Sequence, residues 1–342
     1  MKPLHILVLE ILFAVSLVTS ATAAQNIRPG FRSLGVWNSE ENINLELAIW
    51  YPTTRGTNKI DKGDWIFQSA NNAPPLSGRH PLILLSHDSP GSRFSLHSLA
   101  TALARNGFVI AAITHAGDNI DDMRLLYTGR QLTTRVKQLK FALDILLSNP
   151  ATEPMIDAQH IGMMGIGPGG TAALMLAGAR PETKTWGSFC TEAPESIYCT
   201  PWVKNRMDEF VVDENFIAKD NRINAVCAVA PAYGMFLTPT AMEEISIPIL
   251  YIQADKSQLC PPKLSQTIMA ALTSNRKTAL EFVSLPDADT VTLTSPCGSD
   301  ILTETFPELC RPRPERDEVQ KILASKAEKF FAATLGKKGR RH

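Results

Sequence analysis

Neither sign of charge predominates in this sequence of 342 residues, in which 34 lysines and arginines balance 34 aspartates and glutamates. A neutral chain offers no basic surface to a phosphate backbone, so we expect no nucleic-acid partner. Long hydrophobic runs are also missing, because the apolar stretch at residues 6–18 is too short to cross a membrane as a helix. We therefore expect no integral membrane segment in the mature chain.

Cysteine does not occur before residue 190, and no two cysteines have the spacing C-x-x-C. A zinc site built from cysteines is therefore not indicated. Cys190 and Cys199 bracket a short polar segment and are predicted to form a disulfide. Cys297 and Cys310 are predicted to close a second loop, and Cys260 is an equally possible partner in that bond.

The N-terminal residues have the basic, apolar and small-residue order of a secretory signal peptide. Lys2 precedes the apolar stretch, which Glu10 interrupts, and small residues follow up to Ala23. We expect cleavage near Ala23, so that residues 1–23 form the signal peptide and the mature protein is secreted or periplasmic. Export also makes disulfides chemically permissible.

Short apolar runs alternate with helical patterns along most of the mature chain. Residues 32–37 and 43–51 predict an antiparallel hairpin, and residues 53–80 are rich in turn formers and predict a surface excursion. After them, strands are predicted at 81–86, 108–113, from 161, at 225–230, 249–252 and 279–285, and helices at 96–105, 130–147, 171–177, 262–272 and 315–335. This alternation predicts an α/β fold with a mostly parallel, doubly wound sheet.

The same alternation suggests a single domain over residues 24–336. It is interrupted at residues 181–222, which carry proline, tryptophan, charges and the Cys190 and Cys199 pair, so we expect a lid inserted over the sheet there. The basic tail at 337–342 is interpreted as a solubilising end.

A glycine-rich turn joins the run from residue 161 to the helix that follows it. This strand, turn and helix order is the context of the G-x-S-x-G nucleophile elbow, with Gly165 and Gly169 as its outer glycines. The nucleophile position is Gly167, which has no side chain, and the next residue is Pro168, which has no N–H for an oxyanion hole. Two catalytic functions are therefore absent from adjacent positions.

Several short segments together resemble the predicted dienelactone hydrolase group of α/β-hydrolases, which are exported relatives of the platelet-activating-factor acetylhydrolase type. The resemblance covers nearly all of the mature chain. The segments are Ile49-Trp50-Tyr51-Pro52, Leu84-Leu85-Ser86-His87, the turn from Gly165 to Gly170, Ala228 to Pro231, Ile247-Pro248-Ile249 and the Cys297 and Cys310 tail.

The resemblance implies the α/β-hydrolase fold and a triad of nucleophile, acid and histidine in that chain order. Carried over to this sequence, the nucleophile falls on Gly167, the acid on Asp255 and the histidine near Asp289. After His160 the sequence has no histidine until the last residue, so Asp255 has no evident imidazole to orient.

The first oxyanion turn also departs from the family, whose usual His-Gly reads His87-Asp88 here. We interpret the chain as a protein that has lost ester hydrolysis and binds an unidentified small-molecule or protein ligand, with no cofactor. The alternative is an active ester or lipid hydrolase, of carboxylesterase or acetylhydrolase type, with a non-standard nucleophile. Candidates for that nucleophile are Ser86, Ser89 and Ser92, beside His87 or His115.

Polar groups expected at the same end of the sheet suggest one further hypothesis. They could hold a ligand or a divalent cation through oxygen ligands. A set of solvated loop carboxylates without a metal is the favoured alternative. The cluster consists of His87, Asp88, His115, Asp118, Asp255 and Asp289.

Overall fold

A computed structural model describes residues 26–213, 215–298, 303–304, 307–310 and 312–336. The predicted signal peptide and the basic tail lie outside these residues. Within them, no helix is long and apolar enough to cross a membrane.

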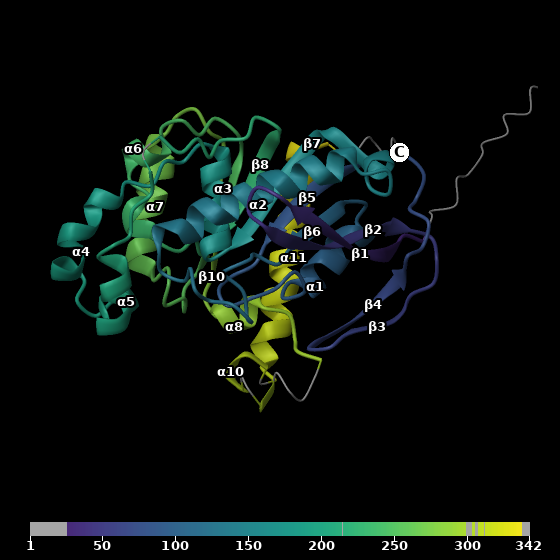
Figure 1. The fold of residues 1–342 in the computed structure, drawn as a ribbon, viewed down its shortest axis with the longest axis horizontal. Coiled ribbons are helices and arrows are strands. Elements are labelled where there is room, and N and C mark those ends of the chain that lie inside the picture. Colours follow the sequence, from purple (N-terminus) through teal and green to yellow (C-terminus); the bar gives the residue numbers. More distant parts are fainter. Residues whose placement is uncertain (1–25, 214, 299–302, 305–306, 311, 337–342) are drawn as a thin grey trace, which may run out of the picture.

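The core of the molecule is a mixed sheet that has ten strands in the described part of the chain, in the order β10-β9-β8-β7-β5-β6-β2-β1-β4-β3 (Figure 1). The strands from β10 to β6 in this order are parallel, and β2 joins them antiparallel to both β6 and β1. Their bounds are β1 Arg28–Asn38, β2 Ile43–Thr53, β3 Asn58–Lys62, β4 Trp65–Asn71, β5 His80–Ser86, β6 Val109–Ile113, β7 Ile156–Ile166, β8 Ile223–Val229, β9 Ile249–Ala254 and β10 Leu280–Leu285.

Helices cover both faces of the sheet, which is why its central strands are continuously apolar. The helices are α1 His97–Arg105, α2 Gly129–Ser148, α3 Pro168–Ala177, α4 Trp186–Glu192, α5 Pro201–Met207, α6 Pro239–Met242, α7 Pro262–Ser274, α8 Thr290–Leu293, α10 Pro307–Cys310 and α11 Pro314–Thr334. Helix α2 packs against α3, and α1 packs against α11. The predicted α/β architecture with an N-terminal antiparallel hairpin is confirmed.

Both predicted disulfides are present, joining Cys190 to Cys199 and Cys297 to Cys310. Cys260 is a buried free thiol, so the alternative pairing of Cys260 with Cys297 is wrong. Two disulfides in one chain are typical of extracellular proteins.

Residues 53–80 are more ordered than their turn-rich composition predicted. They carry β3 and β4, which pair with each other and extend the sheet beyond β1. Ile60, Trp65 and Phe67 are buried in the core, and this alternation of apolar residues outweighs the surrounding glycines and asparagines. The expectation of a surface excursion was therefore wrong.

The segment predicted as a lid, residues 181–222, runs between α3 and β8. It contains α4, α5 and the short 3-10 helices η2 (Thr183–Thr185) and η3 (Ile197–Cys199). Tyr198 in this segment is buried against Tyr233, whose ring centroid lies 5.5 Å away.

Candidate functional site

The glycine-rich turn connects the end of β7 to the start of α3. Gly167 has φ 56° and ψ −125°, in the left-handed region that glycine adopts readily. It is the N-cap of α3, and Pro168 occupies the first helical position, where a missing N–H costs the helix nothing. A β-carbon on Gly165 would collide with the backbone of Gly169, so the turn requires glycine there as well. The backbone of the predicted elbow is therefore formed.

The side chain of Asp88 fills the space beside Gly167. A β-carbon on Gly167 would lie 2.6 Å from Cγ of Asp88 and closer still to its Oδ1. The backbone N–H of Ser89 donates to Oδ1 of Asp88 at 2.8 Å. Burial raises the pKa of Asp88 to about 6, although the Ser89 hydrogen bond and the charge of Arg135 act in the opposite direction.

Asparagine at position 88 is therefore expected to stabilise the protein at pH 8. The folded pKa of about 6 exceeds the ordinary value of 3.8, so ionised Asp88 costs the folded state on the order of 2 to 3 kcal/mol above pH 6. That cost decreases as the pH falls through 6 towards 4, because Asp88 is then protonated in the folded protein. The melting temperature of Asp88→Asn should exceed that of the wild type at pH 8, and the difference should shrink at pH 5. Asp121→Asn, at an exposed position of a neighbouring loop, is the control. A difference in melting temperature between Asp88→Asn and the wild type that is the same at pH 8 and pH 5 would contradict the argument.

Arg135 of α2 lies at the centre of a buried polar network. Its guanidinium is fully buried and donates from Nε to Oδ2 of Asp118 at 2.6 Å. Its other nitrogens donate to Oγ of Ser86 at 3.1 Å, to Oγ of Ser89 at 2.9 Å and to the carbonyl of His87. Burial alone would raise the pKa of Asp118, but the charge and hydrogen bonds of Arg135 hold it below its usual value. The loops after β5 and β6 are thus tied to α2 through one cation.

A serine and a histidine also meet in this network. Nε2 of His115 lies 2.8 Å from Oγ of Ser86, and Nδ1 lies 3.2 Å from Oε1 of Gln138. Ser86, His115 and Gln138 are thus arranged like a nucleophile, its base and the group that orients the base. Ser86 and His115 are both fully buried, however, and Ser86 Oγ already accepts a hydrogen bond from Arg135. Burial, with the charge of Arg135, lowers the pKa of His115 well below 6.5, so the ring is neutral.

His87 is buried in the same network. Its Nδ1 lies 2.6 Å from the carbonyl oxygen of Asp88, and its Nε2 accepts the backbone N–H of His115 at 3.2 Å. Burial and the charge of Arg135 lower the pKa of His87 to about 3. A neutral His87 that donates from Nδ1 therefore satisfies two backbone groups of the adjoining loops.

Solved hydrolase structures have a similar arrangement of strands and helices. A ferulic acid esterase from Streptomyces cinnamoneus matches 94% of this chain and 94% of its own, with a TM-score of 0.59 and 18% identity. A dienelactone hydrolase from Anabaena variabilis matches 90% of this chain and 99% of its own, with a TM-score of 0.50 and 16% identity. The chain has the α/β-hydrolase fold.

Sequence similarity also leads to ester hydrolases. Two cutinases from Thermobifida alba, est2 and est1, are 30% and 29% identical to this chain over 135 residues, which is 39% of the chain. The matched region spans about two fifths of these relatives, 38% and 39% of their lengths. No family model matches the sequence.

Asp255, which the resemblance predicts as the acid position, follows β9. Its carboxylate accepts hydrogen bonds from Ser284 Oγ at 3.0 Å and from the side chain of Gln253. None of the histidines in the described part of the chain hydrogen-bonds to it. Asp289, at the expected histidine position, caps α8 by accepting the N–H of Thr292 at 2.7 Å, and it pairs with Arg313 at 3.1 Å.

The six residues predicted as a ligand or cation cluster do not form one group. His87, Asp88, His115 and Asp118 gather around Arg135, whereas Asp255 and Asp289 have the other partners described above. The described residues contain no group of three or more histidine, cysteine and acidic side chains that could hold a metal ion. The positive charge in the network comes from Arg135, which is not one of the six predicted residues.

The polar face of α2 was the signal that could have revealed this network. Gln131, Arg135 and Gln138 are spaced four and three residues apart, so they share one face of the helix. All three are buried, and Gln131 donates to Asp118 at 2.7 Å while it accepts from the hydroxyl of Tyr233. A polar stripe beside the apolar positions of a core helix predicts a buried network.

Aromatic side chains lie close to Asp88 and the network. Tyr198 and Tyr233 are fully buried, and Tyr127 packs edge-on against Tyr198 with ring centroids 6.2 Å apart. The hydroxyl of Tyr198 donates to the carbonyl of Leu259 at 2.9 Å and accepts the backbone N–H of Tyr233 at 2.9 Å. Asp88 is only 7% exposed. The region of the elbow is therefore filled with protein side chains.

Proposed function

We propose that this protein uses the α/β-hydrolase fold for binding and does not hydrolyse esters through a nucleophile, histidine and acid. The observation that supports this most strongly is the carboxylate of Asp88 in the space beside Gly167. That space is where a nucleophilic side chain would have to stand. Residues 181–222 are proposed to act as the lid of the binding region.

The chemistry around the elbow supports the same proposal. Pro168 offers no N–H to a developing oxyanion, and an ionised Asp88 would repel one. Asp255, the carboxylate predicted to orient a catalytic histidine, accepts from Ser284 and Gln253 and from no histidine of the described residues. Each of these features alone would slow acyl transfer by orders of magnitude.

We expect the purified protein to show no turnover of p-nitrophenyl acetate or butyrate above the buffer rate, and no labelling by a fluorophosphonate probe. A serine cutinase assayed in parallel is the positive control. Mass spectrometry of the intact protein would detect an adduct directly. Measurable turnover, or a covalent adduct on any side chain, would overturn the proposal.

Ester hydrolysis with a non-standard nucleophile is the second candidate, and two observations favour it. Proteins similar in sequence or in structure include two cutinases, a ferulic acid esterase and a dienelactone hydrolase. Ser86 Oγ lies 2.8 Å from His115 Nε2, a distance suited to activation of a hydroxyl. If this candidate holds, Ser86→Ala should abolish turnover and probe labelling. Ser325→Ala, at an exposed position of α11, is the control that should leave both unchanged.

A further inference from the structure

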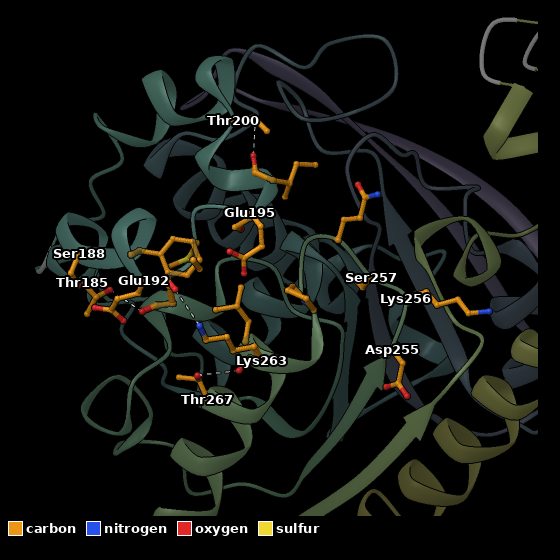
Figure 2. Close-up of a pocket in the computed structure, with 18 residues that line it drawn as sticks. Thr185, Ser188, Glu192, Glu195, Thr200, Asp255, Lys256, Ser257, Lys263 and Thr267 are labelled. Atoms are coloured by element: carbon orange, nitrogen blue, oxygen red, sulfur yellow. Dashed lines mark hydrogen bonds between the residues drawn. The ribbon is translucent and has the colours of Figure 1, made fainter.

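A cavity of about 720 Å³ lies away from the elbow, between the 181–222 segment and the loop that joins β9 to α7 (Figure 2). Its volume falls in the range of small-molecule sites. The residues after the carboxyl end of β9, from Asp255 onward, form part of its wall. In sheets of this kind, ligands bind at the carboxyl ends of the strands.

The inner wall of the cavity is apolar. It includes Phe189 of α4, Ile197 of η3, Met235 of the 3-10 helix η4 (Gly234–Phe236) and Leu264 of α7. The ring of Phe189 stacks on Trp186 with centroids 5.8 Å apart, which holds it in place. A ligand that fills this space therefore needs an apolar body of aromatic or branched aliphatic shape.

The charges at the cavity leave an excess of negative charge. Glu192 and Glu195 both line it, both are exposed, and neither carboxylate has a hydrogen-bond or ion-pair partner among the described residues. The positive charge of Lys263 offsets one of these two negative charges, and its Nζ donates to the backbone carbonyl of Glu192 at 3.3 Å. Figure 2 shows Glu195 in the middle of the cavity wall, above Lys263.

The remaining charged side chains of the lining are already satisfied. Lys256 pairs with Asp287 at 2.8 Å, and Asp255 accepts hydrogen bonds from Ser284. In Figure 2 both Asp255 and Lys256 lie apart from Glu192, Glu195 and Lys263. The charges available to a ligand are therefore those of the two glutamates and the single lysine.

A disulfide fixes the wall that carries the glutamates. The bond between Cys190 and Cys199 closes the loop that holds Glu192, Glu195 and Ile197. Closing the loop reduces the conformational freedom that binding would otherwise remove. The cavity is thus preformed on this side.

We propose that this cavity binds a small amphipathic amine. Its apolar body lies against Phe189, Ile197 and Leu264, and its ammonium group lies beside Glu195 and Glu192. This inference names the ligand class for the binding role proposed above and rests on that role. Carboxylates of this kind attract an ammonium group and oppose an anion of the same shape.

Isothermal titration of the full protein with 2-phenylethylamine, 2-phenylethanol and phenylacetate tests the proposal. These probes share the ring and differ in charge. We expect saturable binding of the amine at millimolar concentration, weaker binding of the alcohol and none of the acid. Equal binding of all three, or tighter binding of phenylacetate, would overturn the assignment of an amine. Absence of heat with every probe would overturn the site.

Variants at the two carboxylates provide the second measurement. Glu195→Gln should weaken amine binding about fivefold and the Glu192→Gln, Glu195→Gln double variant about tenfold or more, while binding of the alcohol stays unchanged. Glu209→Gln, at an exposed position of the same segment that does not line the cavity, is the matched control. Unchanged amine affinity in the double variant would contradict the proposal.

The two proposals can fail separately. Ester turnover together with amine binding would overturn the non-hydrolytic role and leave the amine site standing. No turnover together with no amine binding would leave the non-hydrolytic role standing and refute the ligand class.

Discussion

Replacement of Gly167 by serine is expected to destabilise the protein by more than about 4 kcal/mol and not to create an active nucleophile. A β-carbon at this position would lie 2.6 Å from Cγ of Asp88, which is only 7% exposed and would have to move. The serine backbone would also have to adopt φ 56°, which lowers the stability further. Urea denaturation at pH 8, followed by circular dichroism, measures the loss.

Gly63→Ser is the matched control for backbone strain. Gly63 has φ 67°, and a β-carbon there would meet nothing within 4 Å. Only the left-handed backbone conformation of the serine then lowers the stability, so we expect Gly63→Ser to lose about 1 kcal/mol of unfolding free energy. Similar losses for Gly63→Ser and Gly167→Ser would mean that Asp88 does not occupy the space assigned to it.

The double variant Asp88→Gly, Gly167→Ser should recover much of the stability lost by Gly167→Ser alone. Removal of the carboxylate vacates the space that the serine needs, so the two substitutions should show a favourable coupling of about 2 kcal/mol or more. We expect no ester hydrolysis from the double variant, since Pro168 and the partners of Asp255 are unchanged. Measured turnover would refute this account of the elbow.

The relation between Asp88 and Gly167 shows what could and could not be predicted from the sequence. Local patterns predicted the turn, the missing N–H of Pro168 and the alternation of strands and helices, because each depends on neighbouring residues. The position of Asp88 depends on how the loop after β5 packs against the start of α3, two elements far apart in the chain. The sequence therefore suggested a carboxylate beside the oxyanion, whereas the structure places it beside Gly167.

Asp255 and Asp289 illustrate the same limit. Both follow their strands as predicted, and a shared site was the less favoured of the two hypotheses drawn from that placement. Their local partners are different: Asp289 caps α8, and Asp255 lies beside Ser284 of β10. Aspartate is one of the residues preferred at helix N-caps, so this role of Asp289 was compatible with the sequence. The hydrogen bond to Ser284 required knowledge of strand register.

Arg135→Met is expected to destabilise the protein by about 3 to 5 kcal/mol, because it leaves the carboxylate of Asp118 buried without its cation. Arg135 and Asp118 have side chains that are 0% and 1% exposed, so water cannot replace the lost partner. The loss should be larger at pH 8 than at pH 5, since burial without Arg135 favours the protonated form of Asp118.

Lys137→Met, on the exposed face of the same helix, is the control and should change stability by less than about 0.5 kcal/mol. Addition of Asp118→Asn should recover part of the stability of Arg135→Met, because a neutral amide is far less costly to bury than an unpaired carboxylate. Where Arg135→Met alone does not accumulate as folded protein, the soluble yield of the double variant provides the comparison. An equal loss in the single and double variants would show that Arg135 stabilises the loops through Ser86, Ser89 and His87 and not through its charge on Asp118.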